Sequence, residues 1–241
     1  MNLILLFESD FSTPLDATGC GRVSLSGRRA AYVQSIHRAG PGDELQVGVL
    51  NGRIGRGEIL AVEDDRVDLT VRLERDPPAA LPLNLVLALP RPLVLKRVLI
   101  AATSLGCKRI FLIQSRRVER SFWNSKVLRN GQLDEPLILG LEQAVDTVMP
   151  SVELRTRFKP FVEDELPGLI GEGQAFVAHP GAQRPCPRDL ASQTTLVIGP
   201  EGGFIPYEFE RLDQAGCTGI ALGERILRIE TALPVLLAKM F

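Results

Sequence analysis

The segment Leu196-Val-Ile-Gly-Pro-Glu-Gly-Gly-Phe204 joins a short apolar run to a loop that is rich in glycine. The apolar run predicts a buried strand, and Pro206 stands where the first turn of a helix tolerates proline. Glu208 and Glu210 suit the positive N-terminal end of that helix. Glycines let a ligand approach the backbone, and ligands bind beyond the strand ends of open parallel sheets. The spacing matches neither a dinucleotide fingerprint nor a P-loop, so it predicts another kind of ligand loop or a tight turn.

A second glycine loop lies further along the chain, in Ala221-Leu-Gly-Glu-Arg-Ile-Leu-Arg-Ile-Glu-Thr-Ala232. Pro234 lies inside the final apolar stretch, and proline costs little only in the first turn of a helix. The sequence therefore predicts that the last helix begins near Thr231, as its N-cap, and that Arg228 and Glu230 lie in the loop. The two glycine loops are expected to clasp one ligand. The alternative role of Arg228 and Glu230 is a structural ion pair.

Around these loops, residues 83–241 alternate apolar strands with amphipathic helices. Strands are predicted at 83–89, 109–113, 152–157, 175–178, 195–198 and 219–222, and helices at 93–105, 135–148, 207–215 and 232–239. Continuous apolar strands with intervening helices favour an α/β fold with a mostly parallel sheet that is covered on both faces.

The chain before Asp76 follows a different pattern. Strands are predicted at 3–7, 44–49, 57–62 and 67–73, with a helix at 28–38 and a tight turn at Asn51-Gly52. Asp76-Pro-Pro-Ala-Ala-Leu-Pro82 reads as a linker, because two adjacent prolines break both helices and strands. The 241 residues therefore divide into a small β-barrel-like domain (1–75), a linker (76–82) and an α/β domain (83–241).

The composition is that of an ordinary globular protein, with 45% hydrophobic and 24% charged residues. No apolar run approaches the length of a membrane span, so no membrane partner is expected. Leu3–Phe7 is followed by Glu8 and Asp10 without a basic segment before it, which favours a first strand over a signal peptide. The four cysteines form no CxxC pair, which favours reduced thiols in a cytoplasmic protein and no metal site.

A net charge of −1 hides one strongly basic segment. Ten basic residues and one acidic residue lie between Arg91 and Arg129, whereas acidic residues outnumber basic ones on either side. Basic side chains bind phosphates, and aromatic rings stack on unpaired bases. The residues predicted to bind RNA are Arg91, Lys96, Arg97, Arg116, Arg117, Arg120 and Trp123, the single tryptophan of the chain. The alternative is a solvated helix face over a buried tryptophan.

Taken together, the two glycine loops resemble the two signature segments of the 16S rRNA (uracil(1498)-N(3))-methyltransferase family. The resemblance rests on Ile198-Gly-Pro-Glu-Gly-Gly-Phe204 and Leu222-Gly-Glu-Arg-Ile-Leu-Arg-Ile-Glu-Thr-Ala232. Weaker similarity extends to His179-Pro180, Leu105-Gly106 and Arg38-Ala-Gly-Pro-Gly-Asp43. The family belongs to the SPOUT, or trefoil-knot, superfamily. The resemblance implies a PUA-like, RNA-binding N-terminal β-barrel, a SPOUT α/β domain with a C-terminal trefoil knot, and a homodimer.

The resemblance also implies an enzyme that methylates N3 of a uridine in the 16S rRNA of the small ribosomal subunit, with S-adenosylmethionine as cofactor. The residues that it assigns to the cofactor are His179, Gly199, Pro200, Glu201, Gly202, Leu222, Gly223, Ile226, Leu227 and Arg228. Uracil N3 is not nucleophilic until its proton leaves, so a base is required, and Glu201 and Glu230 are the candidates. Arg228 is the candidate to stabilise charge on a uracil carbonyl oxygen.

Three positions depart from the family pattern. Ala101 stands where the family usually has Lys, Ser104 where it has Glu, and Ala144-Val-Asp146 where it has Ser-Gly-Arg. These departures leave open an RNA-binding or ribosome-assembly factor with an inactive or retargeted methyltransferase fold. A nucleotide- or dinucleotide-dependent enzyme is a further alternative, which the missing GxGxxG spacing disfavours.

Overall fold

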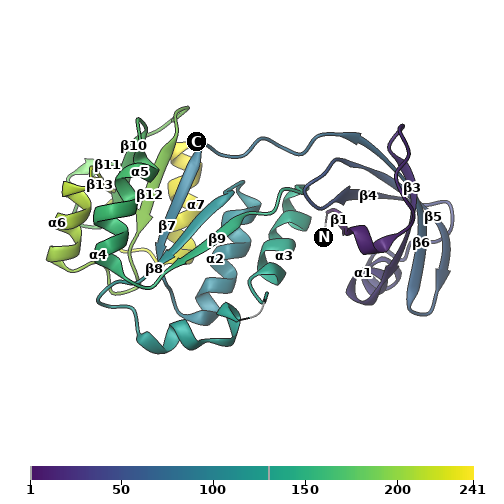
Figure 1. The fold of residues 1–241 in the computed structure, drawn as a ribbon, viewed down its shortest axis with the longest axis horizontal. Coiled ribbons are helices and arrows are strands. Elements are labelled where there is room, and N and C mark those ends of the chain that lie inside the picture. The colour runs from purple at the N-terminus through teal and green to yellow at the C-terminus, as the bar shows by residue number, and fades with distance from the viewer. Residues whose placement is uncertain (1, 130) are drawn as a thin grey trace. The chain divides into compact units, whose positions relative to one another are not determined.

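The computed structural model describes residues 2–129 and 131–241, and only the backbone of residues 36 and 37. The chain forms two compact units (Figure 1). The first unit holds Met1–Pro78 and Leu141–Met149, and the second holds Ala79–Gly140 and Pro150–Phe241. The division at the linker assigned Leu141–Met149 to the α/β domain, and the structure corrects this assignment. The carbonyls of Glu142 and Thr147 in this segment accept backbone hydrogen bonds from Asn2 and Leu3, just before the first strand, and from the Asn51 turn, which explains its place in the first unit.

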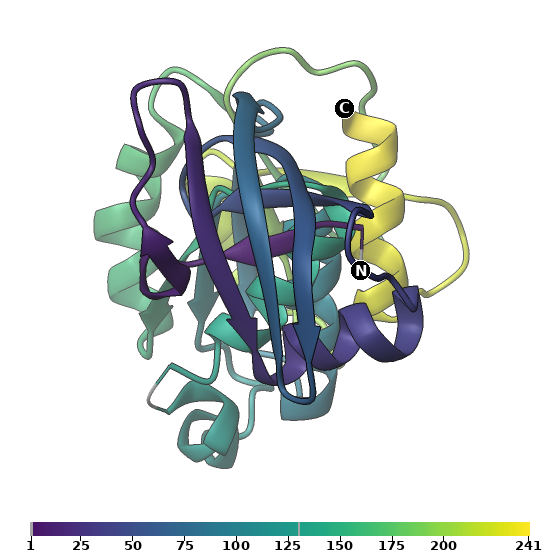
Figure 2. The same cartoon turned by 90° about the vertical axis from the view of Figure 1, so that its right-hand side faces the viewer.

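The first unit is built on a six-stranded sheet that curls into half a barrel (Figure 2). Its order is β1-β4-β5-β6-β3-β2, with β1 and β4 parallel and the other pairs antiparallel. The strands are β1 (Ile4–Leu6), β2 (Phe11–Thr13), β3 (Cys20–Ser26), β4 (Glu44–Val49), β5 (Ile54–Glu63) and β6 (Arg66–Arg75). A 3-10 turn (Glu8–Asp10) and α1 (Gly27–Tyr32), which continues as a π-helical turn (Val33–His37), complete the unit.

Alternate residues of these strands form the core of the first unit. Val23, Leu25, Val67, Leu69 and Val71 are each at most 1% exposed, as the two-residue period of a half-buried strand requires. All four strands predicted for this unit are confirmed, and so is the tight turn. The sequence analysis missed β2 and β3. The three residues of β2 are too few to show alternation, and β3 alternates as a half-buried strand does but has only two large apolar residues, Val23 and Leu25, at its buried positions.

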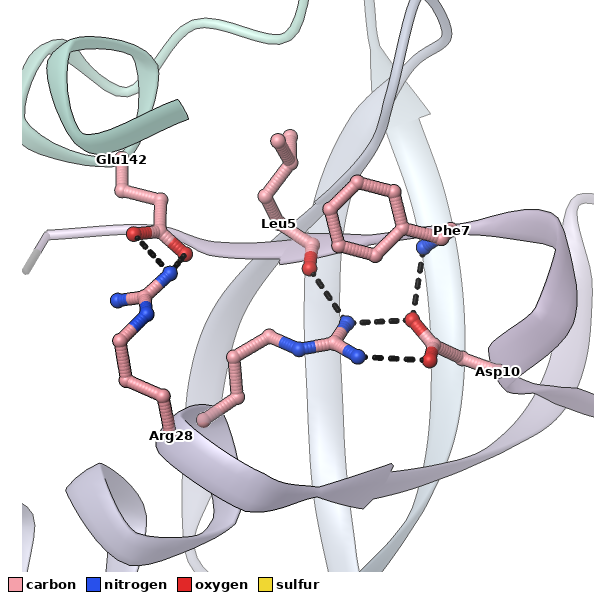
Figure 3. A network of polar contacts seen from close by, with 6 residues as sticks. Leu5, Phe7, Asp10, Arg28 and Glu142 are labelled. Carbon is pink, nitrogen blue, oxygen red and sulfur yellow. Dashed lines mark hydrogen bonds and ion pairs between the residues drawn. The ribbon is translucent and has the colours of Figure 1, made fainter. Parts of the chain in front are cut away.

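A network of partly buried polar contacts links segments of the first unit that are far apart in the chain (Figure 3). The Arg29 guanidinium donates to both oxygens of the Asp10 carboxylate, and also to the carbonyl of Leu5 at 2.8 Å. Arg28 pairs with Glu142 at 2.9 Å, which holds Leu141–Met149 against α1. Burial raises the pKa of the Glu142 carboxyl, and the Arg28 charge opposes that rise. Glu142 is therefore a structural residue of the half-barrel.

The second unit has a seven-stranded sheet in which every strand pair is parallel, in the order β11-β13-β10-β12-β7-β8-β9. The strands are β7 (Leu83–Ala88), β8 (Arg109–Ile113), β9 (Ser151–Arg155), β10 (Gln174–Ala178), β11 (Arg184–Pro185), β12 (Thr194–Ile198) and β13 (Thr218–Ala221). The parallel sheet and all six predicted strands are confirmed, with ends that differ by one or two residues. The trefoil knot does not follow from the strand order and stays a prediction.

Helices cover both faces of this sheet. They are α2 (Pro92–Ser104), α3 (Asp134–Ala144), α4 (Phe158–Pro160), α5 (Leu166–Ile170), α6 (Pro206–Gln214) and α7 (Ile229–Met240). A π-helical turn (Phe161–Glu165) joins α4 to α5, and 3-10 turns (Arg120–Asn124 and Lys126–Leu128) lie between β8 and α3. Helices α2 and α7 lie on one face, and α5 and α6 lie on the other (Figure 1). No helix in the described ranges is long and apolar enough to cross a membrane.

Two predicted helix boundaries are wrong. Helix α3 ends at Ala144 rather than 148, because Val145 has a φ of 58° and leaves the helical region. Helix α7 begins at Ile229 rather than near Thr231, since the N–H groups of Thr231 and Ala232 donate to the carbonyl of Arg228 at 3.0 and 2.7 Å. Pro234 is thus inside the helix, where it costs one backbone hydrogen bond. The buried apolar face of α7 offsets that loss.

Candidate active site

A cavity of about 420 Å³ opens at the carboxyl ends of β10, β12 and β13, between the two glycine loops. We call it the glycine-loop cavity. Every residue that the sequence analysis assigned to the cofactor lines it, although these residues come from three separate segments. They are His179, Gly199, Pro200, Glu201, Gly202, Leu222, Gly223, Ile226, Leu227 and Arg228. The structure therefore brings together the two loops that the sequence analysis expected to share a ligand.

The loop after β12 is both a tight turn and a wall of this cavity. The N–H of Gly203 donates to the carbonyl of Pro200 at 2.7 Å, and Gly203 has a φ of 73°, which favours glycine. A Cβ at Gly199 would lie 3.2 Å from the Phe204 ring, so a side chain there would press on that ring. The segment is therefore both the tight turn and the ligand loop that the sequence analysis offered as alternatives.

The loop after β13 presents its backbone. Gly223 has a φ of 140°, a conformation that residues with a side chain rarely adopt. Within the described residues, the N–H groups of Leu222, Gly223 and Leu227 donate no hydrogen bond. The Ile226 side chain is 81% exposed although it lines the cavity. Free donors beside apolar side chains are the usual lining of a small-molecule site.

The three candidate catalytic residues are placed differently. Arg228 is exposed and lines the cavity in extended conformation, immediately before α7. Glu201 also lines it, and its Oε1 accepts a hydrogen bond from the N–H of Arg91 at 3.2 Å. Glu230 is half-buried in the first turn of α7 and is not among the residues found around the cavity. Its placement in the loop was wrong because the helix begins earlier than Pro234 suggested.

The structural ion pair offered as an alternative role for Arg228 is not found. Within the described part of the chain, Arg228 forms no salt bridge with Glu230 or with any other carboxylate. The guanidinium of Arg228 is therefore available to a ligand of the glycine-loop cavity.

A second and larger cavity, of about 730 Å³, lies beside the first on the same unit. We call it the Trp123 cavity. Its residues come from the loop after β8, from the segment after β9 and from the start of α6. They are Gln114, Ser115, Arg116, Val118, Arg120, Trp123, Thr156, Phe158, Lys159, Ile205, Tyr207 and Glu208. Phe204 of the first cavity and Phe158 of the second have ring centroids 6.1 Å apart, so the two cavities share an aromatic wall.

The residues predicted to bind RNA do not gather on one surface. Arg116, Arg120 and Trp123 line the Trp123 cavity, whereas Arg117 lines the glycine-loop cavity and donates to the carbonyl of Gly202. The other three belong to α2 or to its start: Arg91 precedes the helix, Arg97 is exposed on it, and Lys96 pairs with Glu135 at 3.4 Å. Trp123 is half-buried in a 3-10 turn and does not lie under the solvated face of α2, so the single helix face of the alternative interpretation accounts for only part of the basic segment.

Sequence reasoning missed Ser115, Phe158, Lys159 and Tyr207 as residues of a possible site. These side chains meet only because β8 and β9 end, and α6 begins, at the same edge of the unit. No local motif marks them, and the segment 158–170 was not predicted to be helical.

An all-parallel α/β unit whose two glycine loops close one cavity at the strand ends has the architecture of an RNA methyltransferase. Residues 77–241 match the RNA methyltransferase domain family, and the chain belongs to that family. The resemblance drawn from the glycine loops is thereby confirmed, and the match favours a methyltransferase fold over a dinucleotide-dependent enzyme.

Relatives and solved structures point in the same direction. The chain is 28% identical to the ribosomal RNA small subunit methyltransferase E of Treponema pallidum, over 96% of this chain and 87% of that protein. It is 22% identical to the ribosomal RNA small subunit methyltransferase E 1 of Borreliella burgdorferi, over 96% and 94%. A crystal structure of the ribosomal RNA small subunit methyltransferase E of Neisseria gonorrhoeae, bound to S-adenosylmethionine, has a TM-score of 0.75 and 19% identity over 99% and 95% of the two chains.

Proposed function

We propose that this protein transfers the methyl group of S-adenosylmethionine to N3 of a uridine in the 16S rRNA of the small ribosomal subunit. The observation that carries the proposal is the glycine-loop cavity, which is lined by residues of both family motifs and by Arg228. Membership of the RNA methyltransferase domain family supports it, and so do relatives that are named for the small-subunit ribosomal RNA.

The glycine-loop cavity fits the proposed cofactor in size and in lining. Its volume of about 420 Å³ lies within the ordinary range of ligand pockets, about 300–1,000 Å³. Ile198, Phe204 and Leu222 supply apolar surface for a base and a ribose, and the free N–H groups of Leu222, Gly223 and Leu227 supply donors. When bound, S-adenosylmethionine supplies an electrophilic methyl group on a sulfonium sulfur.

We assign the general base to Glu201 and the charge-stabilising role to Arg228. Glu201 uses Oε1 to accept the Arg91 N–H, whereas its Oε2 accepts no hydrogen bond within the described residues. That oxygen is free to take the N3 proton of the uracil, a step for which general-base help is worth about 10²–10⁴-fold in rate. As the proton leaves, negative charge spreads to the uracil carbonyl oxygens, where the unpaired Arg228 guanidinium stabilises it.

Two of the departures from the family pattern have structural contacts of their own. The Ser104 hydroxyl donates to the carbonyl of Gly140 at 3.1 Å, and the buried Asp146 accepts the N–H of Val148 at 3.0 Å. Ala101 and Ser104, which belong to the same unit as the glycine-loop cavity, are not among the described residues around it. The motif residues that line the cavity are kept, which favours an active enzyme over an assembly factor that lacks activity.

The remaining parts of the proposal concern partners and location. The target uridine must be unpaired or turned out of its stack to enter the cavity, with the half-barrel as an additional RNA-binding unit. Leu93 of α2 is 79% exposed and Val235 of α7 is 38% exposed, so two helices that pack together leave apolar surface for a second copy of the chain. We therefore propose a homodimer, and the proposed ribosomal substrate favours a cytoplasmic location.

The test uses labelled S-adenosylmethionine and small ribosomal subunits from cells that lack the protein. The RNA is digested to nucleosides, and we expect label in 3-methyluridine. Subunits from cells that contain the protein serve as the control, because their target is already methylated and takes up no label. If the protein binds the cofactor and the subunits but transfers no label, the proposed enzyme is rejected in favour of an RNA-binding or ribosome-assembly factor.

A further inference from the structure

We infer that the Trp123 cavity binds a second nucleotide of the RNA substrate, the neighbour of the methylated uridine. Its base would stack on Trp123, and its phosphate would lie between Arg116 and Arg120. The inference rests on the proposed function, because it assumes that the target uridine occupies the adjacent glycine-loop cavity. It adds a site that reads the sequence or shape of the strand beside the target.

The indole of Trp123 is held in place before any ligand binds. Its Nε1 donates to Oε1 of Gln114. The amide nitrogen of Gln114 in turn donates to the carbonyls of Ser115 at 2.5 Å and Val118 at 3.1 Å, which fixes which end of the amide faces the indole. The ring is half-buried and lines the cavity. A fixed aromatic platform loses little conformational entropy on stacking, and such stacking is worth about 1–3 kcal/mol per base.

The charge at the mouth of the cavity is positive. Arg116 and Arg120 are exposed, and within the described residues their guanidiniums form no salt bridge. Lys159 adds a third cation, 3.8 Å from Glu163. Glu208 is the one carboxylate found among the described lining residues; it is 3% exposed and accepts the N–H groups of Arg116 at 2.6 Å and Ile205 at 3.1 Å. It is therefore occupied by backbone donors, and the free side-chain charges favour an anion.

Ser115 provides a polar group without a partner. It is 1% exposed and lines the cavity, and its Oγ has no hydrogen-bond partner among the residues that the structure describes. Leaving a buried hydroxyl unpaired costs free energy, so an unpaired hydroxyl at a cavity wall points to a ligand that completes it. A base edge or a ribose hydroxyl offers both donors and acceptors to this group.

The position of the cavity identifies the occupant as a neighbour of the target nucleotide. The wall between the two cavities consists of the Phe158 and Phe204 rings, 6.1 Å apart at their centroids. Arg116 lines one cavity and the next residue, Arg117, lines the other. Because one layer of side chains separates the two cavities, they can hold consecutive nucleotides of a single RNA strand that is not base-paired.

Fluorescence of Trp123 tests this site directly, because the chain has one tryptophan. The probe is a five-nucleotide single-stranded RNA with a central uridine, titrated into the full-length protein. We expect saturable quenching that weakens with salt. Arg120→Ala should lower the affinity about 10-fold, the scale of one hydrogen bond to a charged group. Arg188→Ala, an exposed arginine of the same unit outside both cavities, should change the affinity less than about 2-fold.

A second variant separates binding from folding. Ser115→Ala removes an unpaired buried hydroxyl, so the melting temperature of the free protein should stay the same or rise. Affinity for the RNA should nevertheless fall about 3- to 10-fold, the scale of one lost hydrogen bond. A variant that melts like the wild type and binds RNA equally well would show that the hydroxyl does not touch the ligand.

Several outcomes would overturn the inference. One is RNA binding without any change in Trp123 fluorescence, and another is wild-type affinity in both the Arg120→Ala and Ser115→Ala variants. If uridine monophosphate binds as tightly as the RNA, the Trp123 cavity is a site for free nucleotides and does not recognise a neighbour of the target. If RNA quenches Trp123 but no methyl group is transferred, the proposed function is rejected, and the cavity remains a nucleotide-binding site. If methyl transfer to the subunits occurs but the Arg120→Ala and Ser115→Ala variants bind RNA like the wild type, only the site is rejected.

Discussion

The glycine-loop cavity and the Trp123 cavity share a wall, yet they are built from different parts of the chain. The first is lined by two loops that follow β12 and β13, and four of its described lining residues are glycines that expose their backbone. The second is bounded by side chains from three segments, among them Trp123, Phe158 and Tyr207. A backbone-lined site depends on conformation, whereas a side-chain-lined site depends on the identity of each residue. The two cavities should therefore respond to different substitutions.

The largest effect is expected for Arg228→Ala. It removes the one side-chain cation that we assign to the reacting uracil, so turnover should fall about 10²-fold or more. Cofactor affinity should fall far less, because the loops present backbone donors to the cofactor. Arg228→Lys should rescue only in part, since an ammonium lacks the planar fork of a guanidinium. Single-turnover methylation and calorimetry of the same samples measure the two quantities. A joint collapse of turnover and cofactor binding would make Arg228 a structural residue.

Gly223→Val should impair the glycine-loop cavity through the backbone. A φ of 140° is strained for valine, and strain of about 1–3 kcal/mol corresponds to about a 5- to 150-fold loss of cofactor affinity if the loop moves to relieve it. Quenching of Trp123 by RNA should be unchanged. Gly216→Val is the matched control, because Gly216 has a φ of 98° but lies outside both cavities. It should lower stability without lowering cofactor affinity, and equal losses from both variants would point to general unfolding.

Charge reversal should affect the Trp123 cavity and leave cofactor binding intact. For single-stranded RNA, the logarithm of affinity falls with the logarithm of salt concentration by about 0.7 per phosphate contact. The double variant Arg116→Glu and Arg120→Glu should therefore reduce the slope by about 1.4. The matched control reverses Arg184 and Arg188, which are exposed elsewhere on the same unit. An unchanged slope in the first variant would mean that the two arginines contact no phosphate.

The smallest effect is expected for Gly202→Ala, in the glycine-loop cavity. A Cβ at Gly202 would lie 3.0 Å from Cδ of Arg117, which is part of a flexible side chain that can move. Cofactor affinity should therefore change less than about 3-fold, a difference below about 0.7 kcal/mol. RNA affinity should change only if the added methyl group displaces the Arg117 side chain. A loss of cofactor affinity as large as that of Gly223→Val would show that Gly202 itself contacts the cofactor.

Apolar runs of strand length and the glycine loops at their ends were enough to predict the strands of the parallel sheet and the two loops that border the glycine-loop cavity. The individual cofactor residues came from the resemblance of those loops to a known family. Because the carboxyl ends of parallel strands lie at one edge of the sheet, loops that follow two such strands can border one site. The basic segment was also evident, since charge is read directly from composition.

The places where side chains from distant segments meet were visible only in the folded molecule. The position of Glu230 depended on where α7 begins, and burial of the apolar face of α7 outweighed the local cost of Pro234. Leu141–Met149 joined the first unit through hydrogen bonds to residues more than ninety positions away in the chain. The Trp123 cavity likewise combines residues of 114–123, 156–159 and 205–208. Such contacts depend on packing between elements, and no short-range pattern records them.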